Sequence, residues 1–503
     1  MSNYREAFRR REHQGRVLEQ RIIDDCARSG HGRPRTRREF LNRGLRGATA
    51  TVLLPSIATL FTRTAYGECL IDDNPLIGSG KIPFLVFDQG GGANIAGSNI
   101  MVGGAGGQED FLEPRGYAKL GLPEAIIPQN VGVDRSFGLA MHPNSALLRG
   151  MLSKTSAATR AATNGVVIPA RSENDTGNNP HNPIYGIARA GADGEFVATI
   201  GTRNSESGGR SRAPAAMIDA TLRPSRVRNR NDAVGLGGGD DETTPNGRIA
   251  QASAVLTALK LGQINEAQAR KELVQCGFDK TTATFNTPIT ASDLDPSQDA
   301  ALQDIFPGNE LTDGDFVRTA ATIKCVVNGY AGAGTIEYGG RDYHQDPRPE
   351  TDGKDFVVGQ AIGASLEYAA RQGKPLMIYG LSDGSVSADT NRREDDGNGV
   401  EKFRWRSDNS QTAASFMLVY SPGGRAVLRN GAASQQLGAF RMDGNIETSA
   451  TPFANSVSTL AELIVLNYLA LHGEQSRFGM VLNNPGLGTG AVVEPYIAFE
   501  AIV

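Results

Sequence analysis

Cysteine is scarce in this sequence, with 4 residues among 503. Cys26 lies in the N-terminal region that we assign below to a targeting signal, which leaves Cys69, Cys276 and Cys325. Three thiols in so long a chain do not make a disulfide framework, and no Cys-x-x-Cys spacing supports a zinc site. At most one disulfide bridge can form among the three.

Long hydrophobic runs and repeats are also missing. The weakly apolar stretch at residues 44–60 is interrupted by Arg46 and Pro55, and it is too short and too polar for a comfortable membrane span. No repeat period of a solenoid or propeller is visible. Hydrophobic residues nevertheless make up 39% of the chain, alongside 61 glycines and 24 prolines. This composition indicates a loop-rich globular protein, long enough for one large α/β domain with insertions or for several smaller domains.

Outside the N-terminus the chain has few basic residues relative to acidic ones. Residues 1–46 hold 13 arginines, no lysine and 6 acidic residues, although the formal net charge of the whole chain is −4. Nucleic acids and anionic membranes are bound by clustered lysine and arginine, so the acidic body argues against both as partners. The turn Gly90-Gly91-Gly92 is followed by no lysine and no Gly-x-Gly-x-x-Gly spacing, so phosphate-loop and dinucleotide sites are only weakly indicated.

The basic N-terminus carries a recognisable motif. Residues 36–42 read TRREFLN and are followed by the weakly apolar stretch and by Ala65-Tyr66-Gly67. This resembles a twin-arginine export signal, Ser/Thr-Arg-Arg-x-Phe-Leu-Lys, with Asn42 in the last position. We therefore predict that residues 1–67 are a signal region, that the protein is periplasmic or extracellular, and that no stable membrane span remains after cleavage. The alternatives are an amphipathic anchor and a basic nucleic-acid arm.

Beyond the signal, apolar runs of strand length alternate with helical patterns. Strands buried on both faces are indicated at residues 82–87, 165–168, 335–338 and 376–379, with further strands at 196–200 and 416–420. Helical spacing occurs at residues 144–162, 252–275, 315–328, 355–372 and 457–471. This alternation predicts an α/β fold with a mostly parallel sheet and helices on both faces. We expect one domain at 68–503 with a loop-rich insertion around 203–312.

Polar side chains follow several of the predicted strands. They are Asp88, then Ser172 and Thr176 in the loop 171–183, then Asp342 and His344 after Gly339-Gly340, and Asp383 in Ser382-Asp383-Gly384. The carboxyl ends of parallel strands meet at one sheet edge, where ligands bind in open α/β sheets, so we expect these residues to converge. Asp342 and His344 are an oxygen and an imidazole ligand that a single ion can collect. The alternative is a set of polar surface turns.

Two other polar features have structural interpretations. The acidic stretch 389–401 lacks the spacing of a helix-loop-helix calcium site, and we predict a solvated loop there. Residues 277–312 are also predicted as loop. His472 follows the helical pattern at 457–471 and precedes a glycine, which indicates a C-terminal helix cap.

Several motifs resemble the domain-of-unknown-function 1501 family, a group of twin-arginine exported proteins in the alkaline phosphatase superfamily. They are Phe87-Asp88-Gln89-Gly90-Gly91-Gly92, Phe137-Gly138-Leu139 with His142-Pro143, and Gly339-Gly340-Arg341-Asp342-Tyr343-His344-Gln345. The last is similar to the family's Gly-Gly-Phe-Asp-Thr-His followed by Gln, and Ser382-Asp383-Gly384-Ser385 is loosely similar to its Ser-Glu-Phe-Gly-Arg. The family's Thr-Asp-His-Gly corresponds here to Ser407-Asp408-Asn409-Ser410, so Asn409 stands where a metal-binding histidine would be.

The resemblance implies an alkaline phosphatase-like fold and a metal-assisted hydrolase of phosphate or sulfate esters. In this hypothesis the partner is a small anionic ester, the cofactor is a divalent zinc, manganese or calcium ion, the nucleophile is Ser172 or Thr176, and the metal ligands are Asp88, Asp342, His344, Asp383 and Asp408. The alternative is a non-catalytic exported protein that keeps the fold to bind a protein partner, in surface assembly or secretion. The missing histidine favours the alternative, and the Asp-x-His spacing favours the hydrolase.

Overall fold

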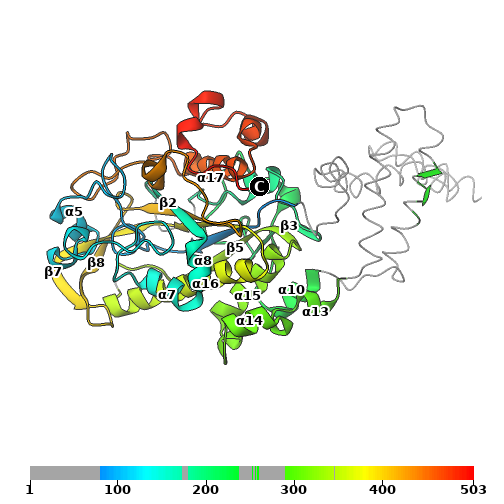
Figure 1. Cartoon of the computed structure of the whole chain (residues 1–503), viewed down its shortest axis with the longest axis horizontal. Coiled ribbons are helices and arrows are strands. Elements are labelled where there is room, and N and C mark those ends of the chain that lie inside the picture. The colour runs from blue at the N-terminus through cyan, green and yellow to red at the C-terminus, as the bar shows by residue number, and fades with distance from the viewer. Residues whose placement is uncertain are drawn as a thin grey trace, which may run out of the picture.

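The computed structural model describes residues 80–172, 179–236, 289–344 and 346–503, together with Ala252, Val255, Leu256, Ala258 and Leu259. The predicted signal region 1–67 and the candidate nucleophile Thr176 lie outside the described residues. The centre of the molecule is a seven-stranded sheet with the strand order β2-β9-β6-β1-β5-β3-β4 (Figure 1).

The sheet is mixed but mostly parallel. Its strands are β1 (Phe84–Gln89), β2 (Thr163–Pro169), β3 (Val197–Gly201), β4 (Ser225–Arg226), β5 (Ala331–Tyr338), β6 (Leu376–Ser382) and β9 (Ala414–Tyr420). β1 lies between β5 and β6 and pairs in parallel with both. β9 runs antiparallel between β6 and β2, so β2 is not a direct neighbour of the other predicted parallel strands. The predicted α/β class with a mostly parallel sheet is confirmed.

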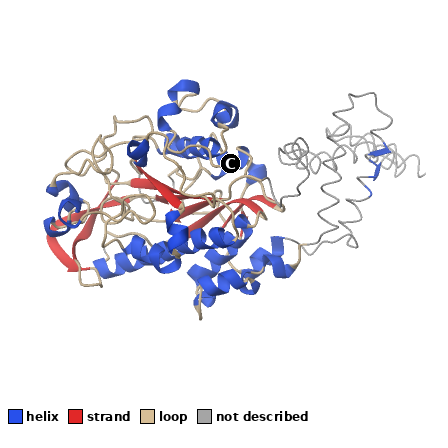
Figure 2. Ribbon diagram, in the orientation of Figure 1, coloured by secondary structure: helices blue, strands red, loops and turns tan. Residues whose placement is uncertain are grey.

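Alternate residues of the sheet face two hydrophobic cores. On one face, Leu85 and Phe87 belong to a core that includes α7 (Ala146–Lys154), α15 (Gly314–Val327) and α16 (Arg348–Arg371). On the other face, Phe84 and Val86 pack with α9 (Ile184–Arg189) and α17 (Val457–Leu471). Successive side chains of a strand point to opposite faces, so a strand that is apolar at every position needs helices on both sides. Figure 2 shows helices above and below the strands.

Shorter helices complete the described part. They are α5 (Pro114–Lys119), α6 (Pro128–Val131), α8 (Ala157–Ala161), α10 (Arg230–Leu236), α13 (Ala291–Leu294), α14 (Ala300–Ile305) and α18 (Phe478–Leu482). The helix predicted at 144–162 is two helices, because Thr155 is extended and the Ser156 side chain caps a new helix by accepting from the Thr159 amide. Within the described residues, the segment 289–312 contains α13 and α14, where we predicted only loop.

A separate two-stranded ribbon extends from one end of the molecule. It consists of β7 (Ser385–Asp395) and β8 (Glu401–Asn409), which pair antiparallel and lie at the left of Figure 1. The solvated loop predicted at 389–401 is therefore wrong over much of its length. The exposed half of β7 is polar on both faces, so it shows no apolar alternation from which a strand could be predicted.

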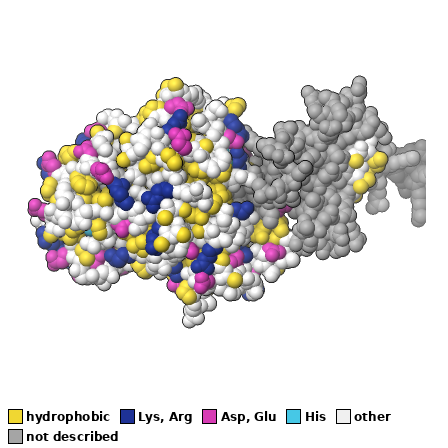
Figure 3. All heavy atoms as spheres, in the orientation of Figure 1, with side chains coloured by type: hydrophobic (Ala, Val, Ile, Leu, Met, Phe, Trp, Pro, Cys, Tyr) yellow, Lys and Arg dark blue, Asp and Glu magenta, His cyan; other side chains and the backbone are white. Residues whose placement is uncertain are grey.

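The surface shown in Figure 3 mixes hydrophobic, basic and acidic side chains. Among the described residues, no helix combines the length and the apolar character that crossing a membrane requires.

Candidate functional site

The carboxyl end of β1 forms the turn Gly90–Gly92, around which the polar residues are arranged. A Cβ atom on the first glycine would lie 2.6 Å from Cδ of Arg210, and one on the second would lie 2.7 Å from the backbone nitrogen of Asp342. A Cβ atom on the third would lie 3.4 Å from Oδ1 of Asp408. Because glycine has no side chain, three chain segments approach the turn this closely. The turn brings together the loop after β3, the turn after β5 and the end of β8.

Asp342, His344 and Asp408 form a compact group beside this turn. One ligand atom from each residue lies within 4.8 Å of those of the other two. Nδ1 of His344 contacts the Asp342 carboxylate and lies 3.3 Å from Oδ2 of Asp408. Two carboxylates and one imidazole are a donor set that zinc and manganese accept, so the residues fit the divalent cation implied by the sequence. The same contacts also describe an aspartate–histidine ion pair without a cation.

The group is open to solvent on one side and anchored on the other. The side chains of Asp342, His344 and Asp408 are 48%, 24% and 43% exposed. Tyr343, between the first two, is fully buried, and its hydroxyl donates to Oδ1 of Asp355 in α16 at 2.6 Å. Burial raises the pKa of Asp355 to about 6. The Tyr343 anchor therefore fixes the backbone from which both ligands extend.

Asp88 and Asp383 lie at the same sheet edge but outside this group. The Asp88 carboxylate accepts from the amide and the hydroxyl of Ser211, at 2.7 and 3.0 Å. Asp383 accepts from Nε of Arg210 and from Nδ2 of Asn179, both at 3.0 Å. Burial raises the pKa of Asp88 to about 7, and the negative charges of Glu337 and Asp383 add to the increase. Both carboxylates therefore accept hydrogen bonds from donors of the protein, and neither belongs to the three-residue group.

The candidate nucleophile Ser172 follows β2 at the same edge, two strands away from β6. Its side chain is buried, and among the residues that the structure describes its Oγ has no hydrogen-bond partner. The preceding residue, Arg171, donates from Nη2 to the hydroxyl of Ser410 at 3.2 Å, so the end of β2 lies against the chain just beyond Asp408. The residue before the predicted nucleophile therefore reaches the loop that follows β8.

Asn409, which the motif resemblance compares with a histidine, has a structural role. Its Oδ1 accepts from the amides of Gln411 and Thr412 at 2.7 and 2.9 Å, which caps the turn after β8. His472 also has a structural role, because it is the C-cap of α17 as predicted. Neither residue takes part in the candidate site.

Sequence reasoning did not select Arg210 and Ser211, which hold the two buried carboxylates. They belong to the segment RNSESGGRSR at 203–212, which we had included in a loop-rich insertion. Arginines on both sides of a Gly-Gly pair were the signal available in the sequence. Comparisons with protein-family models, with curated proteins and with solved structures yield no match to this chain.

Proposed function

We propose that the chain is a divalent-cation-dependent hydrolase of phosphate or sulfate esters, in which Asp342, His344 and Asp408 bind the cation. The observation that carries this proposal is the convergence of these three ligand atoms within 4.8 Å. Their position beyond the carboxyl ends of parallel strands supports it, because ligands bind there in open α/β sheets. The proposal also includes an alkaline phosphatase-like fold and export of the chain. Cell fractionation tests the export.

The residues of the site have separate roles in this proposal. Asp342 and Asp408 supply anionic oxygens, and His344 supplies a neutral nitrogen. A cation held by them polarises an ester oxygen as a Lewis acid. The partial exposure of the three side chains leaves one side of the group accessible to a substrate. Ser172 is the candidate nucleophile, because its hydroxyl is buried and accepts or donates no hydrogen bond within the described residues.

A second candidate is a non-catalytic binding protein with the same fold. It is favoured by the hydrogen bonds that the two buried carboxylates already accept, Asp88 from Ser211 and Asp383 from Arg210. A carboxylate oxygen that accepts from a protein donor has fewer lone pairs left for a second cation. The two candidates differ in one observable, since both allow cation binding but only the first allows ester hydrolysis.

Cation-dependent stability tests the site. Thermal unfolding of the wild type, titrated with Mn²⁺ or Zn²⁺, is expected to move upward with the logarithm of the free cation concentration. The gain is about 2.7 kcal/mol at 100 times the dissociation constant. Asp408→Asn removes one anionic ligand and is expected to abolish the shift and the hydrolysis of p-nitrophenyl phosphate and sulfate. Asp304→Asn is the matched control, because Asp304 is an exposed acid that pairs with Arg371.

The outcomes separate the candidates. Stabilisation that Asp408→Asn loses and Asp304→Asn keeps, together with hydrolysis by the wild type, supports the hydrolase. Cation binding without hydrolysis of either ester supports the second candidate, the non-catalytic binding protein. A wild type that contains no metal and is not stabilised by added cations contradicts the site itself.

A further inference from the structure

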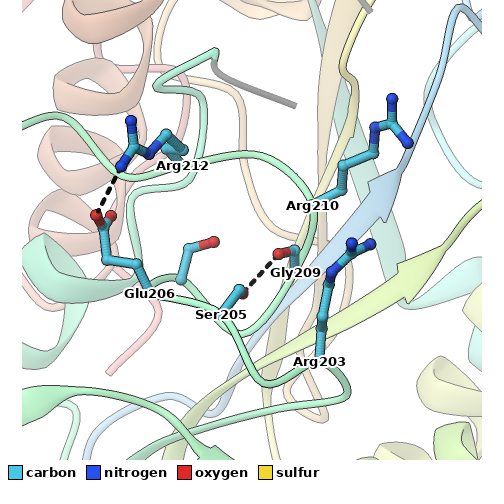
Figure 4. A pocket seen from close by; sticks show the side chains of 7 residues that line it. Arg203, Ser205, Glu206, Gly209, Arg210 and Arg212 are labelled. Carbon is cyan, nitrogen blue, oxygen red and sulfur yellow. Dashed lines mark hydrogen bonds and ion pairs between the residues drawn. The ribbon is translucent and has the colours of Figure 1, made fainter. Parts of the chain in front are cut away.

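The loop 203–212, between β3 and β4, lines an open pocket of about 360 Å³. Its charged lining consists of three arginines and one acid, namely Arg203, Arg210, Arg212 and Glu206. Figure 4 shows the loop as a ring, with Arg203 and Arg210 on one side and the Arg212–Glu206 pair on the other. The pocket is therefore a basic site on an otherwise acidic protein.

Hydrogen bonds within the loop fix its shape. The Ser205 hydroxyl donates to the carbonyl oxygen of Gly209 at 2.6 Å, and the Ser207 hydroxyl donates to that of Ser211. The amide of Arg203 donates to the carbonyl of Gly208 at 2.9 Å, which closes the ring. A loop that is held in this way keeps its inner surface preorganised for a ligand.

The loop also offers backbone N–H groups as hydrogen-bond donors. Within the described part of the chain, no acceptor takes the backbone N–H groups of residues 204–209. Ser207, Gly208 and Gly209 are buried, and two of them, Ser207 and Gly209, line the pocket. A buried N–H group without an acceptor is unfavourable, so these groups favour a ligand that brings several acceptors. An oxyanion has this property.

Two of the guanidinium groups also have N–H donors that their observed partners do not use. Arg203 uses Nη1 on the Glu337 carboxylate at 2.7 Å, and its side chain is 51% exposed. Nη2 of Arg212 lies 3.9 Å from Glu206, which is outside hydrogen-bond distance, and this side chain is 59% exposed. Each guanidinium has five N–H donors in a planar fork that matches the oxygens of a phosphate or sulfate group. Both can turn further donors towards a ligand.

We propose that the loop 203–212 binds a tetrahedral oxyanion, either phosphate or sulfate, free or as the anionic group of an ester. The pocket meets the candidate cation site at the turn Gly90–Gly92, because Cδ of Arg210 lies against the first glycine and Asp342 against the second. Oxyanion binding does not require the cation. That the pocket holds the anionic group of a substrate rests on the proposed function.

Calorimetric titration with inorganic phosphate or sulfate tests the proposal. The full chain is titrated in EDTA, with sodium chloride holding the ionic strength constant. The wild type is expected to bind one anion. Arg212→Gln and the double variant Arg203→Gln with Arg212→Gln are expected to weaken binding, the latter by about tenfold or more, since charge-assisted hydrogen bonds are lost. Arg212→Gln keeps the ion pair between Arg203 and Glu337, so this single variant tests the site even if the double variant does not fold.

Arg226→Gln is the matched control, because Arg226 is an exposed arginine of the neighbouring strand β4. It is expected to change the affinity by less than about twofold. Absence of binding by the wild type overturns the proposal, as does equal weakening by the control and by the loop variants. Competition by p-nitrophenyl phosphate distinguishes an ester group from free phosphate. Asp408→Asn is expected to keep oxyanion binding, so failure of the proposed hydrolase and failure of this pocket give different results.

Discussion

The three glycines of the turn Gly90–Gly92 differ in how strongly an added side chain would collide with its neighbours. The second glycine has φ +128°, and a Cβ atom there would lie 2.7 Å from the backbone of both Arg341 and Asp342. A Cβ atom on the third would lie 3.4 Å from Oδ1 of Asp408 and from Cγ1 of Val386, close to ordinary van der Waals contact. Only the second position therefore combines a strained backbone with a collision that no side-chain rotation relieves.

Alanine substitutions in this turn test that difference. Gly91→Ala is expected to lower the free energy of unfolding by about 2 kcal/mol or more, because it adds backbone strain and pushes the turn that carries Asp342 away. It is also expected to weaken cation-dependent stabilisation. Gly92→Ala is expected to change stability by less than about 1 kcal/mol. Urea unfolding with and without Mn²⁺ measures both effects, and equal losses in the two variants would contradict the assigned role of Gly91.

At the scale of elements, the ribbon of β7 and β8 is held to α16 by buried charges. Nζ of Lys402 in β8 lies 2.5 Å from Asp352 of α16 and 3.1 Å from Asp396 in the ribbon turn. Arg348 pairs with Asp352 at 2.9 Å and stacks over the ring of Trp405, 4.4 Å from its centre. These charged side chains are almost fully buried, so each one needs its oppositely charged partners to offset the cost of removing its charge from water. Asp408 lies on β8, so the same contacts position one candidate ligand.

Removal of the lysine tests this anchor. Lys402→Met is expected to destabilise the protein by about 3–5 kcal/mol, because it leaves Asp352 and Asp396 without their shared cation. Arg406→Gln, on the same strand, removes an exposed arginine that pairs with Asp389 and is expected to cost less than about 1 kcal/mol. Chemical denaturation compares the two variants. Similar stability of Lys402→Met and the wild type would show that the buried charges do not anchor the ribbon.

The elements that the sequence predicted share a physical origin. The helix at 457–471 has the predicted bounds, because its apolar residues fill one core and a capping residue marks each end. The core strand β1 was also predicted, since it is apolar on both faces. The exposed part of β7 was not, because a polar ribbon is stabilised by its pairing and by buried charges that lie far away in sequence.

The same distinction applies to the candidate site. Asp342 and His344 were found from their position after a strand, which is a local property of the sequence. Asp408 was found only from a motif resemblance. The contact of Arg210 with Asp383 links residues 173 positions apart, and neither periodicity nor spacing encodes such a contact. Local patterns therefore predicted candidate ligands but not the donors that bind Asp88 and Asp383.

At the scale of the whole molecule, the C-terminal end of α17 is joined to the segment that enters β1. Nε2 of His472 accepts from the amide of Ile82 at 3.0 Å, and the Tyr468 hydroxyl donates to the carbonyl of Ile82 at 2.8 Å. Lys81 and Glu474 form an ion pair at 2.5 Å. The strand that carries the glycine turn is thus fixed at its start by the end of the chain's last long helix.

The pH dependence of stability tests this connection. Nδ1–H of His472 donates to the carbonyl of Tyr468, so acceptance from Ile82 requires a neutral ring. Burial lowers the pKa of His472 from 6.5 to about 4. The folded state therefore binds fewer protons than the unfolded state between these values, and the stabilisation is complete above pH 6.5 and is lost as the pH falls towards 4.

His472→Ala should therefore destabilise the protein most at neutral pH, by about 1–3 kcal/mol, because the Ile82 amide loses its acceptor. The difference from the wild type should narrow between pH 6.5 and 4, where unfolding of the variant takes up about one proton fewer. His142 and His181 are also buried with lowered pKa values, so only the difference between the two proteins isolates His472. Denaturation curves that stay a constant distance apart from pH 7 to pH 4 would mean that the bond to Ile82 does not depend on a neutral ring.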